Sequence, residues 1–341
     1  LIMKYGLFSG CLWGLDTVIL GIALTMVPFI GTAEALALGA IVSSALHDVC
    51  CALWLLLYMG VRGRLKDTLA ALKTRSGKVV IIGSGIMVLT GVVIGLTGHG
   101  TPLAFILGAL LGGPIGMTGY VTAINNIGAG YTAIISSFYP AFGTLMAVLL
   151  LKEKITPGRV VALIVALAGI IAMGYLSADT TVTGDPIIGL LGALAAVFGW
   201  GSEAVLCAWG MRDDAVDNET ALQIRETTSA LVYLIVVLPI FGAWAFTWNA
   251  VPNPGTAVVA LAALAGTCSY LFYYKGIAVI GAARGMALNI SYSAWAVLFG
   301  LILLGTVPGP VEIVCCIAIL CGTILAACDW GELFGTKKAE A

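Results

Sequence analysis

Long apolar stretches separated by short polar connections run through most of the chain. About 20 consecutive apolar residues are enough for an α-helix to cross the hydrocarbon core of a bilayer. Stretches of that length predict ten membrane-spanning helices, at 4–26, 34–59, 103–124, 131–151, 159–176, 187–209, 221–243, 256–274, 285–304 and 310–328. A further apolar run occupies 79–97.

The composition agrees with this pattern. Of the 341 residues, 60% are hydrophobic and only 10% are charged, and the mean hydropathy is +1.08. No stretch between the spans is long enough to form a separate soluble domain. The nine cysteines lie in or beside apolar runs and have neither disulfide-framework nor metal-site spacing. The sequence therefore predicts an all-α polytopic membrane protein without a metal or other cofactor.

The positions of lysine and arginine predict the orientation, because these residues are retained on the cytoplasmic side. With a cytoplasmic amino terminus, all 16 basic residues fall at the cytoplasmic ends of the ten spans. They are Lys4, Arg62, Arg64, Lys66, Lys73, Arg75, Lys78, Lys152, Lys154, Arg159, Arg212, Arg225, Lys275, Arg284, Lys337 and Lys338. The predicted outer loops, at 27–33, 125–130, 177–186, 244–255 and 305–309, contain none. We expect a protein of the cytoplasmic membrane with both termini inside and a cytoplasmic tail at 329–341.

The run at 79–97 conflicts with this count. Its sequence alone predicts a full span, but a full crossing would invert every later span and place nine basic residues outside. We therefore expect this segment to enter and leave the membrane on the cytoplasmic side, or to lie peripherally.

The two halves of the chain resemble each other. LWGLD at 12–16 matches GWGSE at 199–203, and at a constant offset of 153 several residues of the first half fall on equivalents in the second. The equivalent pairs are Trp13 and Trp200, Asp16 and Glu203, Tyr139 and Tyr292, Phe142 and Trp295, Pro157 and Pro310, and Gly169 and Gly322. Five spans per half is an odd number, so the pattern predicts two inverted five-helix repeats, at 1–176 and 187–328.

Glycines spaced four residues apart occur in two of the predicted spans, as Gly6, Gly10 and Gly14 and as Gly108, Gly112 and Gly116. This spacing lets helix backbones approach closely within a membrane. We expect these glycines to pack helices and not to bind a ligand.

Ionisable side chains inside the spans are candidates for chemistry, because they are costly in a bilayer and usually face a cavity or a partner. Asp16 lies near the middle of the first span and Glu203 somewhat inside the middle of its own, while His47 and Asp48 interrupt the second. Asp16, His47 and Asp48 are candidates for carrying a coupling proton. Each of the four could instead be a structural group bonded to a neighbouring helix.

Aromatic residues gather at the same depth. Helical residues three or four apart share a face. The residues aligned in this way are Trp13 with Asp16, Trp200 with Glu203, Tyr270 with Tyr273 and Tyr274, and Asn289 with Tyr292 and then Trp295. Aromatic rings attract organic cations by about 0.5–2 kcal/mol each, and quaternary ammonium groups are common ligands of such cages. Trp200 would provide a ring face and Glu203 the opposite charge.

Several motifs resemble those of a known family. They are GALLGGPIGM (108–117), SSFYPAFGTLMAVLLLKEKIT (136–156), WGSEAVL (200–206), QIRETTSALVYLIVV (223–237) and SYLFYYKGIAVIGAARGMALNISYSAWAVLF (269–299). The duplicated ten-span layout resembles the EamA-like drug/metabolite transporter superfamily, and the motifs are similar to those of its LicB-type choline permeases. The resemblance covers residues 34–328. It implies a choline transporter with a site near Trp13, Trp200, Glu203, Tyr270, Asn289, Tyr292 and Trp295.

The chain departs from the expected family pattern in two places. The 62–101 region is longer than expected for the family, so the resemblance does not predict the topology of this region. Asp16 is an acid where the family is not expected to have one, so the substrate or the coupling ion can differ from that of the family.

These features together predict a secondary transporter that imports choline or a related quaternary ammonium compound, driven by the membrane potential, with protons as a candidate coupling ion. An exporter of amino acids or cationic drugs is the alternative within the superfamily.

An intramembrane enzyme is the less favoured alternative. It would need a nucleophile with a base, or a metal cluster, and His47 and His99 are the two histidines available to form one. The absence of a GxxxxGK[ST] loop excludes ATP hydrolysis by that machinery. The expected partners are the lipid bilayer and a small organic cation, and no nucleic acid.

Overall fold

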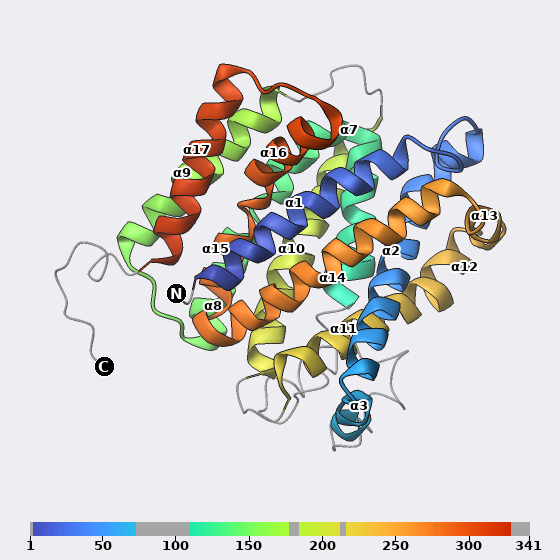
Figure 1. Cartoon of the computed structure of the whole chain (residues 1–341). Helices are drawn as coiled ribbons and strands as arrows, with labels where there is room; N and C mark the ends of the chain where they lie inside the picture. The colour runs from blue at the N-terminus through green and yellow to red at the C-terminus, as the bar shows by residue number, and fades with distance from the viewer. Residues whose placement is uncertain (1–2, 73–109, 177–183, 212–215, 329–341) are drawn as a thin grey trace.

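The computed structural model describes residues 3–72, 110–176, 184–211 and 216–328, which form helices joined by turns, without a strand. Figure 1 shows the helices packed side by side in one bundle. The predicted all-α architecture of a polytopic membrane protein is confirmed.

The helices divide into two sets along the chain. The first set is α1 (Lys4–Leu24), α2 (Ala33–Val61), α3 (Leu65–Leu72), the π-helical segment η1 (Leu111–Met117), α7 (Thr118–Ser136), α8 (Tyr139–Leu151) and α9 (Pro157–Leu176). The second set is α10 (Pro186–Gly210), α11 (Asn218–Val232), η2 (Tyr233–Val237), α12 (Leu238–Ile240), α13 (Trp244–Ala250), α14 (Pro254–Ile280), α15 (Ala282–Asn289), α16 (Tyr292–Leu304) and α17 (Pro310–Ala327).

Nine helical segments among the described residues are long and apolar enough to cross a membrane, and each corresponds to one predicted span. The remaining predicted span, 103–124, begins outside the described residues and continues as η1 and the start of α7. The apolar run at 79–97 lies wholly outside them.

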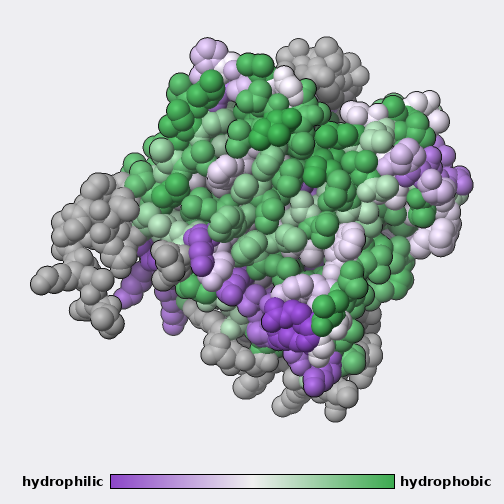
Figure 2. All heavy atoms as spheres, viewed as in Figure 1, coloured by the Kyte–Doolittle hydropathy of each residue, from purple (hydrophilic) through white to green (hydrophobic). Residues whose placement is uncertain are grey.

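The outer surface suits a lipid environment. Figure 2 shows apolar side chains over most of the visible face, with hydrophilic residues along its lower edge. Lys4 and Lys275 both lie over the ring of Tyr5, and Lys154, Arg159 and Arg284 share one crevice. We call the end of the bundle formed by these five basic residues the basic end.

The structure carries the internal repeat in its backbone. Helices α8 and α16 begin 153 residues apart, at Tyr139 and Tyr292, and α9 and α17 begin at the equivalent prolines. Gly128, inside α7, has φ 79° and ψ 161°, and its equivalent Gly281, between α14 and α15, has φ 87° and ψ 165°. Such positive φ angles favour glycine, so one glycine marks the same break in each repeat.

The breaks refine two predicted boundaries. Residues 125–130, predicted as an outer loop, are helical on either side of a kink at Gly128 inside α7, and the next span begins at Tyr131 as predicted. Helix α14 continues beyond the predicted end at residue 274 to Ile280 and stops at Gly281. In both cases one glycine redirects a helix where hydropathy suggested a loop.

The two repeats pack through their first helices. Helix α1 lies against α14 and α16 of the second repeat, while α10 lies against α7 and α8 of the first. The Gly6, Gly10 and Gly14 series faces Leu288, Ser291 and Trp295 with no space for a side chain. The predicted close packing at these glycines is confirmed. Gly169 and Gly322, which are equivalent, likewise lie at the crossing of α9 and α17.

One span of each repeat is interrupted. The span 131–151 breaks between α7 and α8, and the span 282–304 breaks between α15 and α16. Discontinuous spans in transporters form binding sites near the middle of the membrane, where the two repeats meet.

Candidate functional site

A cavity of about 50 Å³ lies where the interrupted spans meet α1, α10 and α14. Its lining is mainly aromatic. The lining residues are Trp13, Tyr139, Trp200, Glu203, Ser269, Tyr270, Tyr273, Asn289 and Tyr292. Two pairs that are equivalent in the repeat, Trp13 with Trp200 and Tyr139 with Tyr292, both lie in this wall, and the other five lining residues come from the second half.

The rings of the wall support one another. Trp13 and Tyr270 meet edge to face with centroids 5.0 Å apart, and Tyr139 and Trp200 do so at 5.9 Å. The indole Nε1 of Trp200 donates a hydrogen bond of 3.0 Å to the carbonyl oxygen of Gly112. The rings are thus fixed before any ligand enters.

Glu203 is the acidic residue in this wall, and it already has a cationic partner. Arg225 of α11 donates from Nε to Glu203 Oε1 at 2.7 Å and from Nη2 to Oε2 at 3.2 Å. Its remaining nitrogen, Nη1, donates to Glu226 Oε1 at 2.6 Å. All three side chains are almost completely buried. A buried pair of this kind requires a close, multiply hydrogen-bonded geometry to offset the loss of hydration.

Arg225 was expected at a cytoplasmic end as part of the topology signal, and the structure corrects this. It lies seven residues after Asn218, the first residue of α11, and is 1% exposed. Its guanidinium carbon lies 4.7 Å from the centroid of the Tyr270 ring. The signal that could have found it is the pair of ionisable residues, Arg225 and Glu226, inside a predicted span.

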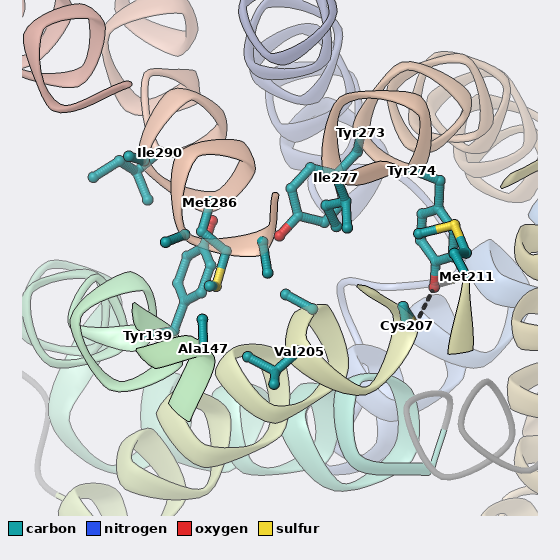
Figure 3. Close-up of a cluster of buried hydrophobic side chains, with 14 of the residues drawn as sticks. Tyr139, Ala147, Val205, Cys207, Met211, Tyr273, Tyr274, Ile277, Met286 and Ile290 are labelled. Carbon is teal, nitrogen blue, oxygen red and sulfur yellow. Dashed lines mark hydrogen bonds between the residues drawn. The ribbon is translucent and has the colours of Figure 1, made fainter. Parts of the chain in front are cut away.

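The neighbouring residues Tyr273 and Tyr274 point in different directions. Figure 3 shows Tyr274 directed at Cys207 and Tyr273 directed toward Met286. The hydroxyl of Tyr274 lies 2.9 Å from Cys207 Sγ and donates a 3.4 Å bond to Glu203. Tyr273, with Tyr292, lines the cavity, and neither hydroxyl has a hydrogen-bond partner among the described residues. These two hydroxyls are available to a ligand.

A polar strip joins the repeats on another side of the cavity. Tyr139 donates to Asn289 Oδ1 at 3.0 Å, and Asn289 Nδ2 donates to Ser9 Oγ at 2.8 Å. Ser9 Oγ in turn lies 3.2 Å from Ser269 Oγ. The strip therefore fixes the orientation of Asn289.

The π-helical segment η1 brings backbone close to the charged groups. A Cβ added at Gly112 would overlap the Glu203 carboxylate, and one at Gly113 would overlap the Ser229 hydroxyl. A Cβ at Gly116 would lie 3.1 Å from the Trp200 ring. Gly112 and Gly116 pack helices, as predicted, and the surfaces that they contact are side chains of the site; Gly108, the third glycine of that series, lies outside the described residues.

Asp16, His47 and Asp48 form a separate buried group. His47 Nε2 lies 2.9 Å from Asp16 Oδ1, and His47 Nδ1 lies 3.6 Å from Asp48 Oδ1. Asp48 Oδ2 accepts a hydrogen bond from Ser229 of α11. Asp16 is not among the cavity-lining residues, so the repeat-related acids Asp16 and Glu203 have different surroundings in the described part of the chain.

Six of the eight residues predicted to bind substrate line the cavity, namely Trp13, Trp200, Glu203, Tyr270, Asn289 and Tyr292. Tyr274 lies behind Glu203, and Trp295 packs against Gly14 of α1. Three lining residues, Tyr139, Ser269 and Tyr273, are not assigned to the site by the sequence analysis. The repeat offset offered a signal for Tyr139, which is equivalent to Tyr292.

A larger hollow of about 450 Å³ adjoins the cavity at Tyr292, which lines both. Residues near its other end include Thr306 and Pro308, in the predicted outer loop. The cluster drawn in Figure 3 fills the space between Tyr139 and Met211, which caps the end of α10. The cavity thus adjoins a hollow through Tyr292 and a packed apolar core through Tyr139 and Tyr273.

Comparisons with known proteins add three findings. The model of the EamA-like transporter family matches residues 2–175 and 187–328. Protein LicB of Haemophilus influenzae is 29% identical over 232 residues, which cover 66% of this chain and 75% of that protein. A crystal structure of 18% sequence identity matches 95% of this chain and 96% of its own with a TM-score of 0.63, and this likeness shows the fold.

Proposed function

Because the chain belongs to the EamA-like transporter family, we propose that it imports choline or a related quaternary ammonium compound by alternating access. The observation that carries the proposal is the cavity walled by six aromatic rings and one carboxylate. Quaternary ammonium groups cannot form hydrogen bonds, and aromatic cages bind them through the ring quadrupoles.

The polar atoms of the cavity fit the rest of choline. The free hydroxyls of Tyr273 and Tyr292 can accept from, or donate to, a ligand hydroxyl. A bare tetraalkylammonium ion would leave them unused. This arrangement supports choline, and other hydroxylated or carboxylated quaternary ammonium compounds, over purely apolar cations.

For the direction of transport, our proposal takes the basic end as cytoplasmic, as the positive-inside rule predicts. The hollow beside Tyr292 then faces outward, and the packed cluster around Met286 closes the inner side. A cation entering from outside moves with an inside-negative membrane potential, which supports import.

The buried group of Asp16, His47 and Asp48 is our candidate for proton coupling. His47 lies between two carboxylates in a region that is almost completely buried. Histidine changes charge near neutral pH, so this group can take up and release a proton during a transport cycle.

The test is uptake of labelled choline into proteoliposomes. An imposed inside-negative potential should drive uptake, and an inward proton gradient should increase it further. Failure of choline to accumulate under either gradient, together with accumulation of amino acids in inverted vesicles, would support an exporter instead.

A further inference from the structure

We propose that Arg225 occupies the substrate's place at Glu203 in the empty transporter and moves onto Glu226 when an organic cation binds. This inference rests on the proposed function, because it assigns the event by which that site admits its substrate. Three observations carry it: the interactions of Arg225 with the cavity wall, its second carboxylate, and the charge balance.

Arg225 makes the two interactions that a bound quaternary ammonium group would need. It pairs with Glu203, the carboxylate of the wall, and its guanidinium lies 4.7 Å from the centroid of Tyr270, one of the wall's rings. Its Nη2 also donates to the Tyr270 hydroxyl at 3.3 Å. A substrate that pairs with Glu203 must therefore compete with Arg225.

Glu226 offers Arg225 a second position. Its Oε1 already accepts from Arg225 Nη1 at 2.6 Å. Its Oε2 is buried and has no hydrogen-bond partner within the described ranges. A buried carboxylate oxygen without a donor is costly, and a shift of the guanidinium fork from Glu203 to Glu226 would satisfy it. Neither Arg225 nor Glu226 is among the lining residues of the cavity, so Arg225 and the substrate compete for the Glu203 carboxylate and not for the space of the cavity.

The charges of Glu203, Arg225 and Glu226 balance once a cation binds, beside the neighbouring pair of His47 and Asp48. Glu203, Arg225 and Glu226 together carry a net charge of −1 when all are ionised, since two acids face one base. A monovalent cation at Glu203 then gives two neutral pairs, the substrate with Glu203 and Arg225 with Glu226. Buried charges that remain paired avoid the large desolvation cost of an isolated ion.

The exchange would also affect the helix that carries Arg225. Ser229, one turn farther along α11, donates to Asp48 beside His47. A change in the position of Arg225 therefore acts on the same helix that contacts the candidate proton site, which gives substrate binding a physical route to coupling.

The test measures choline affinity through quenching of the tryptophan fluorescence of the cavity, with the full-length protein in detergent. Glu226→Gln removes the second carboxylate and should weaken choline binding about tenfold, as expected for loss of one charged partner. Arg225→Lys keeps the charge but loses the bidentate fork, so this weaker competitor should let choline bind several-fold more tightly. Glu219→Gln, an acid in the first turn of α11, is the matched control and should leave the affinity unchanged.

The outcomes separate the two proposals. Wild-type protein that binds no quaternary ammonium compound contradicts the proposed function and the exchange together. If the wild-type protein binds choline, two results contradict the exchange alone: a choline affinity of Glu226→Gln equal to that of the wild type, or a weaker affinity in Arg225→Lys. Arg225 would then serve only to position Glu203. Elution of each variant as a monodisperse peak on size-exclusion chromatography confirms that it is folded.

Discussion

The two acids that the internal repeat makes equivalent, Asp16 and Glu203, are paired in different ways. Each lies three residues after a tryptophan of the cavity wall. Each pairs with a side chain from the next long helix of its own repeat, Asp16 with His47 of α2 and Glu203 with Arg225 of α11. Histidine can lose its charge near neutral pH, whereas arginine keeps its charge throughout.

This difference indicates a division of labour between the repeats. The half with a titratable partner has its acid outside the cavity lining, and we propose that this acid exchanges a proton. The half with a permanent cation has its acid in the cavity wall, and we propose that an organic cation replaces the arginine there. The duplicated fold thus keeps part of its symmetry in the aromatic wall, through Trp13 with Trp200 and Tyr139 with Tyr292, and loses it in the charged groups. The predictions below test whether the two acids really differ.

The largest effect is expected from Glu203→Gln. Removing one partner of a buried ion pair leaves the other charge under-compensated and costs about 3 kcal/mol of stability, and choline should lose its countercharge. Asp16→Asn should cost less, about 1 kcal/mol, because neutral His47 can keep a hydrogen bond to the amide. Chemical unfolding in detergent with choline-binding isotherms for both variants checks this. Equal losses in the two variants would contradict the division of labour.

The aromatic wall should respond more evenly. Replacing Trp200 or Tyr292 by Leu keeps apolar area and removes most of the cation–π attraction, so choline binding should weaken about two- to thirtyfold in each case. The symmetric partners Trp13 and Tyr139 should give losses in the same range. Trp248→Leu is the control, since Trp248 is 67% exposed and stacks on Trp244 away from the cavity. A loss confined to one repeat would mean that the wall, too, is asymmetric.

The sequence could predict the spans and much of the wall, because apolar length and helical spacing are local properties. The repeat offset also pointed to Tyr139, because Tyr139 is equivalent to Tyr292. The sequence could not tell which of the two equivalent acids faces the cavity, because that depends on how α1 and α10 are rotated by packing against α14 and α7. Trp295 shows the same limit: it shares a helix face with Tyr292 by spacing, yet it packs against Gly14.

Arg225 illustrates a second limit. A basic residue near the end of a predicted span can extend its long side chain to the membrane surface, and the positive-inside rule treats it in that way. Here Arg225 is directed inward by two carboxylates, one of them from α10. Only the way in which α10 and α11 each pack against α14 distinguishes these cases. The 79–97 segment and the assignment of both termini to the cytoplasm stay predictions.

A smaller and more specific effect is expected at the histidine. His47→Gln and Asp16→Asn should each remove the dependence of choline uptake on a proton gradient. Choline affinity should stay within about twofold of wild type, because a charge at a distance changes the binding free energy less than a direct contact does. Uptake into proteoliposomes at fixed potential, with and without a pH gradient, measures this. Retention of proton-driven uptake in both variants would make Asp16 and His47 structural.

The smallest effect concerns an exposed link between α2 and α11, the helices that carry His47 and Arg225. Arg64, which follows α2, donates to Asp217 at 2.7 Å and to Glu219. Partial burial raises the pKa of Asp217, but the hydrogen bonds from Arg64 and Thr220 together outweigh it and the pKa is lowered overall. A lowered carboxyl pKa stabilises the folded state at pH values above the pKa of the unfolded state, about 4, and this stabilisation is lost as the pH falls through the pKa of the folded state.

Because the pair of Arg64 and Asp217 is partly exposed, Arg64→Gln should cost only about 0.5 kcal/mol of stability at pH 7, against about 3 kcal/mol for the buried pair of Glu203. Thermal unfolding of both proteins should therefore differ slightly at pH 7 and converge below pH 4. A difference that stays constant down to pH 3 would show that Arg64 acts through packing and not through its charge.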